Sequence, residues 1–251
     1  MNILIMGYGF VGKSVHNHLC VSENRCSKKH FVGIDDESKG FKADPYQGYD
    51  SAFICVPTPT IDHEQVISTV EQCVDKIINY FKVNLIIIKS TILPKYAQIL
   101  CKGNVIYVPE FLDQANPYAE NRKHIVGSDQ ISLTAKYKAI FGPDEEYFIT
   151  SPKTASMIKY VHNTHGALKV AFFNEIFDIC QDNNIDYREM SRILLSINSN
   201  VGEKYTRIAA DGQRGFGGTC FPKDTKAFVS GYDSKILNAA LDANKKYERT
   251  N

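Results

Sequence analysis

Short apolar runs and helical segments alternate along the first 150 residues. Strands that are buried on both faces read as nearly continuous apolar stretches, whereas helices repeat their apolar residues every three or four positions. The sequence predicts strands at residues 2–6, 31–34, 52–56, 84–89, 104–108 and 124–126. It predicts helices from the first glycine turn to Cys20 and over residues 64–81 and 131–140. This alternation is typical of an α/β fold with a doubly wound parallel sheet, which we expect for residues 1–150.

The pattern changes after the first 150 residues, where the strand signals stop. Apolar residues recur at helical spacing over residues 154–181, and a further helix is predicted at 187–196. Residues 198–218 read as a polar loop and residues 222–247 as mostly helical. We therefore expect a second, mostly helical domain over residues 151–251. The apolar stripe of its long first helix predicts burial against another helix.

Composition narrows the class of protein. The chain has 251 residues, of which 43% are hydrophobic, and a formal net charge of +1. This balance gives no general reason to expect nucleic acid or an anionic membrane as a partner. No apolar run approaches the roughly 20 residues that span a bilayer. The apolar start of the chain lacks the basic flank and the cleavage site of a signal peptide.

Cysteine and histidine usage indicates a cytoplasmic protein without a metal. The seven cysteines are scattered and include no C-x-x-C pair, so neither a disulfide framework nor a zinc site is expected, and a reducing compartment fits better. The seven histidines show no metal-ligand spacing.

A glycine-rich turn follows the first predicted strand. Gly7, Gly9 and Gly12 form G-x-G-x-x-G before a predicted helix, where they allow a tight turn, close approach of a pyrophosphate and close helix packing. The second strand ends at Asp35, whose carboxylate can accept both ribose hydroxyls. An acid at this point favours NAD over NADP, because it repels a 2′-phosphate. The motif predicts a Rossmann-type NAD-binding domain, with a merely structural turn as the alternative.

Residues 215–224, GFGGTCFPKD, carry a second chemical signal. Their glycines let the backbone approach a ligand, and Pro222 suits the first turn of a helix. Cys220 would then lie beside the free N–H groups of a helix start, with Lys223 nearby, a setting that stabilises a thiolate. Asp224 follows one turn later and could orient a water or a substrate hydroxyl. The stretch favours a reactive thiol over an inert core cysteine.

The long predicted helix carries two polar residues on one face. Lys159 and Asn163 are four residues apart and share that face with Gly166. A solvated polar patch is the alternative interpretation of the pair. The neighbouring His162 and His165 are expected to be hydrogen-bonded helix residues rather than ligands.

In order and spacing, these motifs resemble those of the UDP-glucose/GDP-mannose dehydrogenase family along nearly the whole chain. The most specific are Lys-Tyr-x-x-Asn…Phe-Phe-Asn-Glu and GFGGTCFPKD. The matching segments are residues 7–12, 32–35, 55–59, 90–94, 109–112, 159–175 and 215–224. The resemblance implies oxidation of the C6 alcohol of a nucleotide sugar to a carboxylate, in two hydride transfers to NAD. Cys220 would add to the aldehyde as a thiohemiacetal, which is oxidised to a thioester and then hydrolysed.

The resemblance also implies roles for single residues. Lys159 and Asn163 would stabilise the C6 oxygen, with Asp224 assisting Lys159 and the water. Glu110 would act in thioester hydrolysis, and Thr91 would position water. The cofactor site would comprise Gly7, Gly9, Phe10, Val11, Gly12, Asp35, Val56, Pro57, Thr58, Ser90, Thr91 and Lys223. The nucleotide sugar would contact Phe111, Leu112, Lys159, Asn163, Tyr205, Arg207, Phe216, Gly217, Gly218 and Cys220.

The sequence departs from the family pattern in its second half. Family members usually continue into a third domain that grips the uridine diphosphate, whereas this sequence ends in the helix that leads there. The sequence is consistent with a truncated chain and with a naturally short protein. The loop over residues 205–215 resembles that of short family members, which favours a naturally short protein. The arginine that a partner subunit commonly supplies corresponds to Asn200, with Lys204, Arg207 and Arg214 as candidate substitutes.

Two further departures concern the cofactor: Gln114 stands where an acid often lies in the nicotinamide site, and Lys95 replaces a turn glycine. UDP-glucose is the leading substrate, with GDP-mannose or a UDP-N-acetylhexosamine as alternatives that use the same chemistry. A non-catalytic NAD-binding module is the alternative of another class, and the presence of all six catalytic residues argues against it. A homodimer built on the apolar face of residues 154–181 is expected, since the family pairs the equivalent helix.

Overall fold

The structure is a computed structural model that describes residues 1–26, 30–62, 64–112, 122–209 and 212–247, with the backbone alone for residues 21–26. The chain divides into two compact units. The first comprises Met1–Pro59 and Gln65–Lys159, and the second comprises Thr60–Glu64 and Tyr160–Asn251. Among the described residues, no helix combines the length and the apolar character that crossing a membrane requires.

In the described part of the first unit, seven strands form one sheet in the order β2-β1-β3-β6-β7-β8-β9. They are β1 (Asn2–Met6), β2 (Phe31–Asp35), β3 (Ser51–Ile54), β6 (Leu85–Ile88), β7 (Val105–Tyr107), β8 (Lys123–Gly127) and β9 (Glu146–Thr150). The predicted doubly wound α/β sheet is confirmed, although β8 runs antiparallel to β7. The sequence analysis did not predict β9, which pairs with β8 at the sheet edge. Most side chains of this edge strand are exposed, so it lacks the buried apolar signature of the others.

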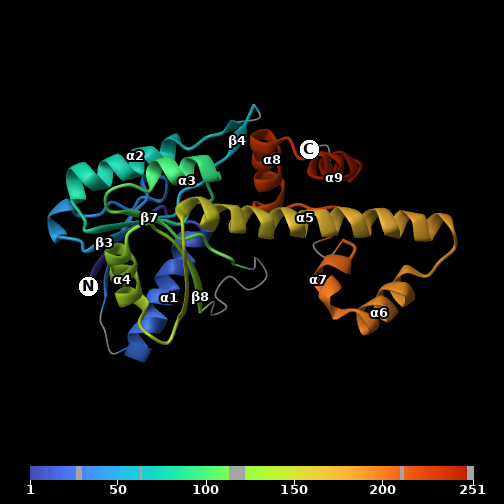
Figure 1. Ribbon diagram of the computed structural model, residues 1–251, viewed down its shortest axis with the longest axis horizontal. Helices are drawn as coiled ribbons and strands as arrows, with labels where there is room; N and C mark the ends of the chain where they lie inside the picture. The colour runs from blue at the N-terminus through green and yellow to red at the C-terminus, as the bar shows by residue number, and fades with distance from the viewer. Residues whose placement is uncertain (27–29, 63, 113–121, 210–211, 248–251) are drawn as a thin grey trace. The chain divides into compact units, whose positions relative to one another are not determined.

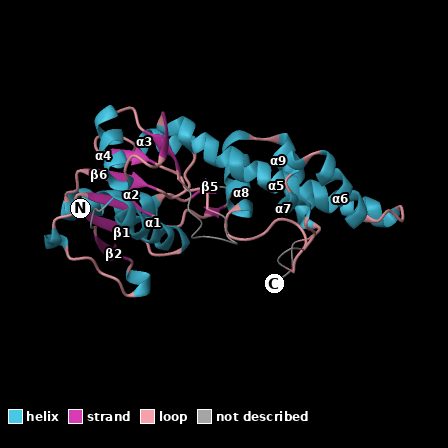
Figure 2. Ribbon diagram, turned by 90° about the horizontal axis from the view of Figure 1, so that it is seen from below, coloured by secondary structure: helices cyan, strands magenta, loops and turns pink. Residues whose placement is uncertain are grey.

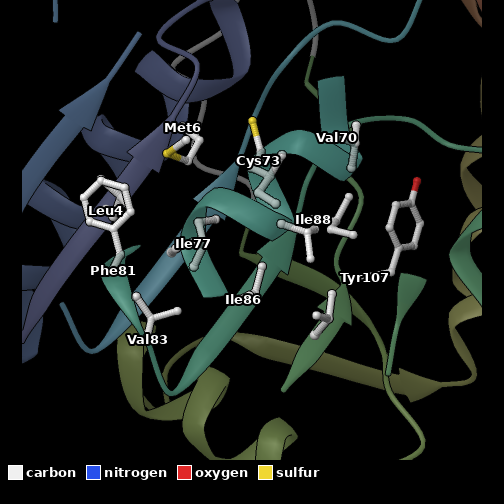
Figure 3. Packing of buried hydrophobic residues seen from close by; sticks show 14 of the residues in the cluster. Leu4, Met6, Val70, Cys73, Ile77, Phe81, Val83, Ile86, Ile88 and Tyr107 are labelled. Carbon is white, nitrogen blue, oxygen red and sulfur yellow. The ribbon is translucent and has the colours of Figure 1, made fainter. Parts of the chain in front are cut away.

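Alternating side chains of the strands build two apolar layers, because successive residues point to opposite faces of a sheet. Leu4 and Met6 pack with Cys73 in the layer covered by α2 (Ser68–Lys76) and α3 (Pro94–Leu100). Ile3 and Ile5 pack under α1 (Phe10–Cys26) and α4 (Ile131–Phe141). Figure 1 shows these helix pairs on opposite sides of the sheet, and Figure 3 shows Met6 near Cys73 of α2. The helices of this unit are α1 (Phe10–Cys26), η1 (Glu37–Lys39), η2 (Pro45–Gln47), α2 (Ser68–Lys76), η3 (Ile77–Phe81), α3 (Pro94–Leu100) and α4 (Ile131–Phe141).

The helix predicted over residues 64–81 is shorter than expected. Two-residue strands, β4 (Thr60–Ile61) and β5 (Glu64–Gln65), precede it, and α2 begins only at Ser68. Gln65 is held in an extended conformation because its side-chain amide bonds the chain beyond β6. Its Nε2 donates to the Thr91 carbonyl at 2.9 Å, and its Oε1 accepts from the Leu93 N–H at 2.8 Å. The tertiary structure therefore overrides the helical pattern at this point.

Helices make up most of the second unit, as Figure 2 shows in cyan. They are α5 (Pro152–Asp182), which begins in the first unit, α6 (Tyr187–Ile197), η4 (Ser199–Val201), α7 (Glu203–Thr206), α8 (Phe221–Tyr232) and α9 (Lys235–Lys245). The long predicted helix is confirmed. The polar loop predicted over residues 198–218 is wrong in part, because η4 and α7 lie within it. The helical stretch after Pro222 is broken at Asp233, which has a left-handed φ of 44° and ends α8.

Candidate active site

The glycine turn after β1 has the shape of a dinucleotide-binding loop. Gly7 has a φ of 86°, and a Cβ on Gly12 would lie 2.1 Å from the Gly7 carbonyl oxygen, so both positions require glycine. A Cβ on Gly9 would meet no described atom within 4 Å, which leaves open space in front of this residue. Phe10 and Val11 begin α1, whose first N–H groups are a ready anion site. The loop therefore fits the pyrophosphate of a dinucleotide.

The acid expected to bind the ribose is engaged elsewhere. Asp35 is only 5% exposed, and its carboxylate accepts a hydrogen bond from Lys76 Nζ at 2.8 Å. The next residue, Asp36, turns to the glycine loop and accepts from the Tyr8 N–H at 2.7 Å. Although burial raises its pKa, hydrogen bonds from Ser38 and from the Tyr8 N–H help to lower the pKa of Asp36 to about 2. Asp36 is thus a second candidate for the ribose contact, and the expected role of Asp35 stays a prediction.

Side chains tie together the loops at the carboxyl ends of β3 and β6. The Thr58 hydroxyl donates to the Thr91 carbonyl at 2.6 Å, and the Ser90 hydroxyl donates to the Val56 carbonyl at 2.7 Å. Gln65 adds its bond to the same Thr91 carbonyl. The sequence analysis expected the Ser90 and Thr91 hydroxyls at the crevice and Thr58 at the cofactor. In the structure the Thr58 and Ser90 hydroxyls fix the two loops, and the expected roles of these residues at the cofactor stay predictions.

Lys159 and Glu110 form a buried ion pair in the first unit. Lys159 Nζ lies 2.8 Å from Glu110 Oε2, and the two side chains are 4% and 11% exposed. The ammonium group also lies 5.3 Å from the centre of the Phe111 ring, within the range of a cation–π contact. The structure thus rejects the solvated patch as an account of Lys159. Burial of both charges makes the geometry of this pair important, because losing either partner would leave an uncompensated charge.

A small pocket opens beside Glu110. Its described lining includes Glu110, Phe111, Leu112 and Lys89 around a cavity of about 50 Å³. Burial lowers the pKa of Lys89 to about 8, although Cys55 and Glu110 act in the opposite direction. Lys89 is not among the site residues predicted from the sequence, because it stands at the end of an apolar run typical of a buried strand. The positive residue at the carboxyl end of a buried strand was the signal that could have identified it.

In the second unit, Asn163 and Asp224 form a buried hydrogen-bonded pair. Asn163 Nδ2 donates to Asp224 Oδ2 at 2.6 Å, and Asp224 is 1% exposed. Lys223 forms an ion pair with the other carboxylate oxygen of Asp224. The side-chain partners of Asp224 found here are therefore Asn163 and Lys223, and its expected assistance to Lys159 stays a prediction.

Cys220 is the N-cap residue of α8, and Pro222 lies in the first turn, as the sequence predicts. The thiol is partly exposed, and Thr219 Oγ1 lies 3.7 Å from its sulfur. Phe221 packs on α5 at a point where only glycine leaves room: a Cβ on Gly166 would lie 2.5 Å from the Phe221 ring. Gly166 therefore positions the helix start that carries the thiol.

Some residues expected at the nucleotide sugar are exposed next to the thiol, and others are buried in the core or paired at the surface. Gly217 and Gly218 are exposed before the thiol, and a Cβ on Gly217 would meet no described atom within 4 Å. Phe216 is 4% exposed, and its side chain packs in the helical core, so a contact between this residue and the nucleotide sugar stays a prediction. Arg207 is a solvated surface residue, 60% exposed, that pairs with Glu203 at 2.7 Å.

The candidate substitutes for the missing partner arginine have structural contacts. Lys204 lies over the Tyr205 ring at 5.2 Å. Arg214 forms an ion pair with Asp178, with 2.6 Å between Nη2 and Oδ1, and its guanidinium lies over the ring of Phe177 in α5. Gln114 lies outside the described residues.

Two family models match the chain. Residues 36–143 match the NAD binding domain of the UDP-glucose/GDP-mannose dehydrogenase family, and residues 153–246 match the central domain of the same family.

Individual relatives cover nearly the whole length of this chain. The UDP-glucose 6-dehydrogenase of Rickettsia typhi is 30% identical over 295 aligned residues, which cover 98% of this chain and 67% of that protein. A solved UDP-glucose dehydrogenase from Pyrobaculum islandicum has a TM-score of 0.79 at 21% identity, covering 98% of this chain and 68% of that one. A UDP-D-ManNAc dehydrogenase from Pyrococcus horikoshii has a TM-score of 0.75 at 19% identity, with the same coverage. The chain thus spans about two thirds of the length of these relatives.

Proposed function

This chain belongs to the UDP-glucose/GDP-mannose dehydrogenase family of NAD-dependent enzymes, and on that basis we propose that it oxidises UDP-glucose to UDP-glucuronate. The C6 alcohol loses four electrons in two hydride transfers, with two NAD⁺ and one water consumed. The observation that carries the proposal is the arrangement of polar residues on α5. The buried Lys159–Glu110 pair is followed one turn later by the buried Asn163–Asp224 pair. Buried charged groups and hydrogen-bond donors that are held by partners in this way are typical of sites that stabilise charge during a reaction.

The first unit supplies the cofactor site in this proposal. The open space at Gly9 and the start of α1 suit the pyrophosphate, and Asp36 suits the adenosine ribose. When bound, NAD⁺ supplies the hydride acceptor for each two-electron step. Asp36 replaces Asp35 in this role, because Asp35 is buried against Lys76.

Lys159 and Asn163 would act on the C6 oxygen. As the alcohol loses its proton and a hydride, negative charge develops on this oxygen, and an ammonium and an amide N–H are suitable donors for it. Glu110 holds the Lys159 ammonium at 2.8 Å, and Asp224 holds the Asn163 amide at 2.6 Å. Fixed donors of this kind need little reorganisation during the reaction.

Cys220 would carry the second oxidation. Its sulfur bonds to C6 of the aldehyde, and the aldehyde oxygen takes up a proton, which gives a thiohemiacetal. Loss of a second hydride and of the hydroxyl proton leaves a thioester. Water then adds at C6 and the carbon–sulfur bond breaks, so that the carboxylate leaves and the thiol returns. Glu110 would take the proton of this water, which Thr91 would help to position.

The test counts NADH formed per UDP-glucose consumed, with GDP-mannose and UDP-N-acetylglucosamine in parallel. Two NADH per UDP-glucose are expected. If two NADH form only with one of the other nucleotide sugars, that sugar is the substrate and the proposed reaction mechanism still holds. Normal NAD⁺ binding without NADH from any of the three would favour the non-catalytic module.

A variant at the thiol separates the two oxidation steps. Cys220→Ser should bind NAD⁺ with unchanged affinity but lose steady-state turnover by about 10²-fold or more, because a serine hydroxyl is a poor nucleophile without a base. Turnover is followed by NADH absorbance, and binding by calorimetry. Cys101→Ser, at a half-buried thiol outside the candidate site, is the matched control. Turnover in Cys220→Ser equal to that of the control would refute the role of the thiol.

A further inference from the structure

Three residues from separate segments of the first unit meet in a compact cluster. His18 comes from α1, His124 from β8, and Glu145 directly precedes β9. His18 Nε2 lies 3.4 Å from Glu145 Oε1, and His124 Nε2 lies 3.4 Å from Glu145 Oε2. The coordinating atoms of all three residues lie within 4.8 Å of one another. The cluster takes no part in the proposed oxidation of the sugar.

The spacing of these atoms matches the coordination of a tetrahedral metal ion. Imidazole nitrogens and carboxylate oxygens bind Zn²⁺ at about 2.0–2.2 Å. Two such ligands at the tetrahedral angle are then about 3.3–3.6 Å apart, by the same bond lengths. Each imidazole Nε2 lies 3.4 Å from one oxygen of Glu145, His18 from Oε1 and His124 from Oε2, so each nitrogen–oxygen separation falls in this range with a different carboxylate oxygen. Two imidazoles and one carboxylate are also a donor set that suits zinc and its neighbours in the first transition row.

The groups around the cluster fix its ligands in orientation. His124 Nδ1 lies 2.8 Å from the hydroxyl of the fully buried Tyr137, so Nε2 is the nitrogen that faces Glu145. The Phe141 ring packs on both imidazoles, at 4.5 Å from His18 and 4.9 Å from His124 between ring centres. A second hydrogen bond on the far ring nitrogen is the usual outer support of a metal-bound histidine.

A fourth coordination position is available on the side of the pocket. Both His18 and His124 line the cavity of about 50 Å³, which has room for water molecules. Three protein ligands and one open position are the arrangement of an accessible zinc site rather than of a closed structural one.

We propose that His18, His124 and Glu145 form a binding site for one divalent transition-metal ion, with Zn²⁺ as the best-matching ion. The ion would link α1, β8 and the start of β9, three segments that are distant in the sequence. It would therefore stabilise the first unit, because a ligand that binds only the folded state raises its stability by mass action.

The test measures Zn²⁺ retained by the full chain in equilibrium dialysis, followed by metal analysis. One Zn²⁺ per chain is expected for the wild type. His18→Ala, at a partly exposed position that should still fold, and Glu145→Gln should weaken binding by about 100-fold or more. His16→Ala is the matched control, since His16 lies on the same helix but bonds the Tyr8 hydroxyl instead. Equal retention by His18→Ala and the control would overturn the site.

Co²⁺ in place of Zn²⁺ gives a readout that does not depend on the variants. The wild-type protein should show the visible absorption of a four-coordinate cobalt site with nitrogen and oxygen ligands. It should lack the near-ultraviolet charge-transfer band of cysteine ligation, so zinc bound at the thiols would be recognised. Zn²⁺ should also raise the unfolding temperature of the wild type and of His16→Ala, but not that of His18→Ala. A thiolate band, or the absence of any stoichiometric metal binding by the folded wild type, would refute the proposal.

Discussion

Lys89 carries a positive charge into the interior beside the candidate active site. Burial lowers the pKa of its ammonium from 10.5 to about 8. Between these two values the unfolded chain binds more protons than the folded protein, so the contribution of this residue to stability rises with pH across that window. Below about pH 8 the folded protein bears the full cost of burying the charge.

Replacing this lysine by an apolar residue should therefore stabilise the protein. We expect Lys89→Met to have a larger free energy of unfolding than the wild type at pH 7, by about 1–3 kcal/mol. The difference should shrink as the pH approaches 10. Urea unfolding across this pH range measures both effects, with the exposed Lys136→Met as a control. A difference that grows with pH would contradict the assignment of the shifted pKa to Lys89.

The two neighbouring acids at the end of β2 should respond differently to substitution. Asp36→Ala should weaken NAD⁺ binding by about 10–100-fold, the loss of one or two hydrogen bonds to a charged acceptor. Asp35→Ala should leave affinity nearly unchanged but lower stability, because it breaks the contact with Lys76. Calorimetric titration with NAD⁺ on folded protein measures the affinities. A larger loss of affinity in Asp35→Ala would restore the ribose role to that residue.

At the scale of elements, the turn between β1 and α1 contains three glycines, two of which are needed for packing and one of which leaves space for a ligand. Gly7 and Gly12 are required by the protein itself, whereas Gly9 faces open space. A methyl group at position 12 must push α1 away from the turn, since its Cβ would lie 2.1 Å from a carbonyl oxygen. A methyl group at position 9 has room but occupies the approach of the pyrophosphate.

This contrast predicts opposite effects for two substitutions in one loop. Gly12→Ala should lower the free energy of unfolding by about 1–3 kcal/mol or more. Gly9→Ala should leave the unfolding temperature of the free protein unchanged and weaken NAD⁺ binding by about tenfold or more. Thermal unfolding with and without NAD⁺ distinguishes the two variants. The interpretation fails if Gly9→Ala destabilises the free protein as much as Gly12→Ala does.

At the scale of the whole molecule, α5 carries apolar side chains that its own unit leaves uncovered. Val161, Phe172 and Ile179 are 53%, 52% and 48% exposed. Their spacing of 11 and 7 residues keeps them on one stripe of a helix. Exposed apolar stripes of this kind mark protein–protein contacts. The homodimer expected from the sequence stays a prediction, and this stripe is its most direct support.

Sedimentation in the micromolar range tests the dimer. We expect the wild type to sediment as a dimer and Phe172→Glu as a folded monomer, because a charge in the centre of an apolar contact is costly to desolvate. Ile131→Glu, at an apolar residue of α4 that is 89% exposed, should not change the assembly. A monomeric wild type would exclude the dimer at these concentrations.

Much of this molecule follows from local sequence pattern. The apolar runs predicted the strands β1, β2, β3, β6, β7 and β8 of the sheet within one or two residues, and the helical period predicted α5 over nearly its full length. The glycine spacing predicted the turn before α1, and Pro222 predicted the first turn of α8. These features depend on side-chain periodicity and backbone conformation, which are properties of neighbouring residues.

Only the tertiary structure determined the direction in which each of these side chains points and the residues that it contacts. Asp35 and Asp36 are adjacent, and only the packing of β2 against Lys76 and the glycine loop separates their roles. Phe216 lies in a motif that indicates substrate contact, yet the core of the helical unit takes its side chain. His18, His124 and Glu145 show no metal spacing in the sequence, because their proximity comes from the order of strands in the sheet. Contacts between residues distant in the chain depend on how the elements pack, and no local pattern encodes that packing.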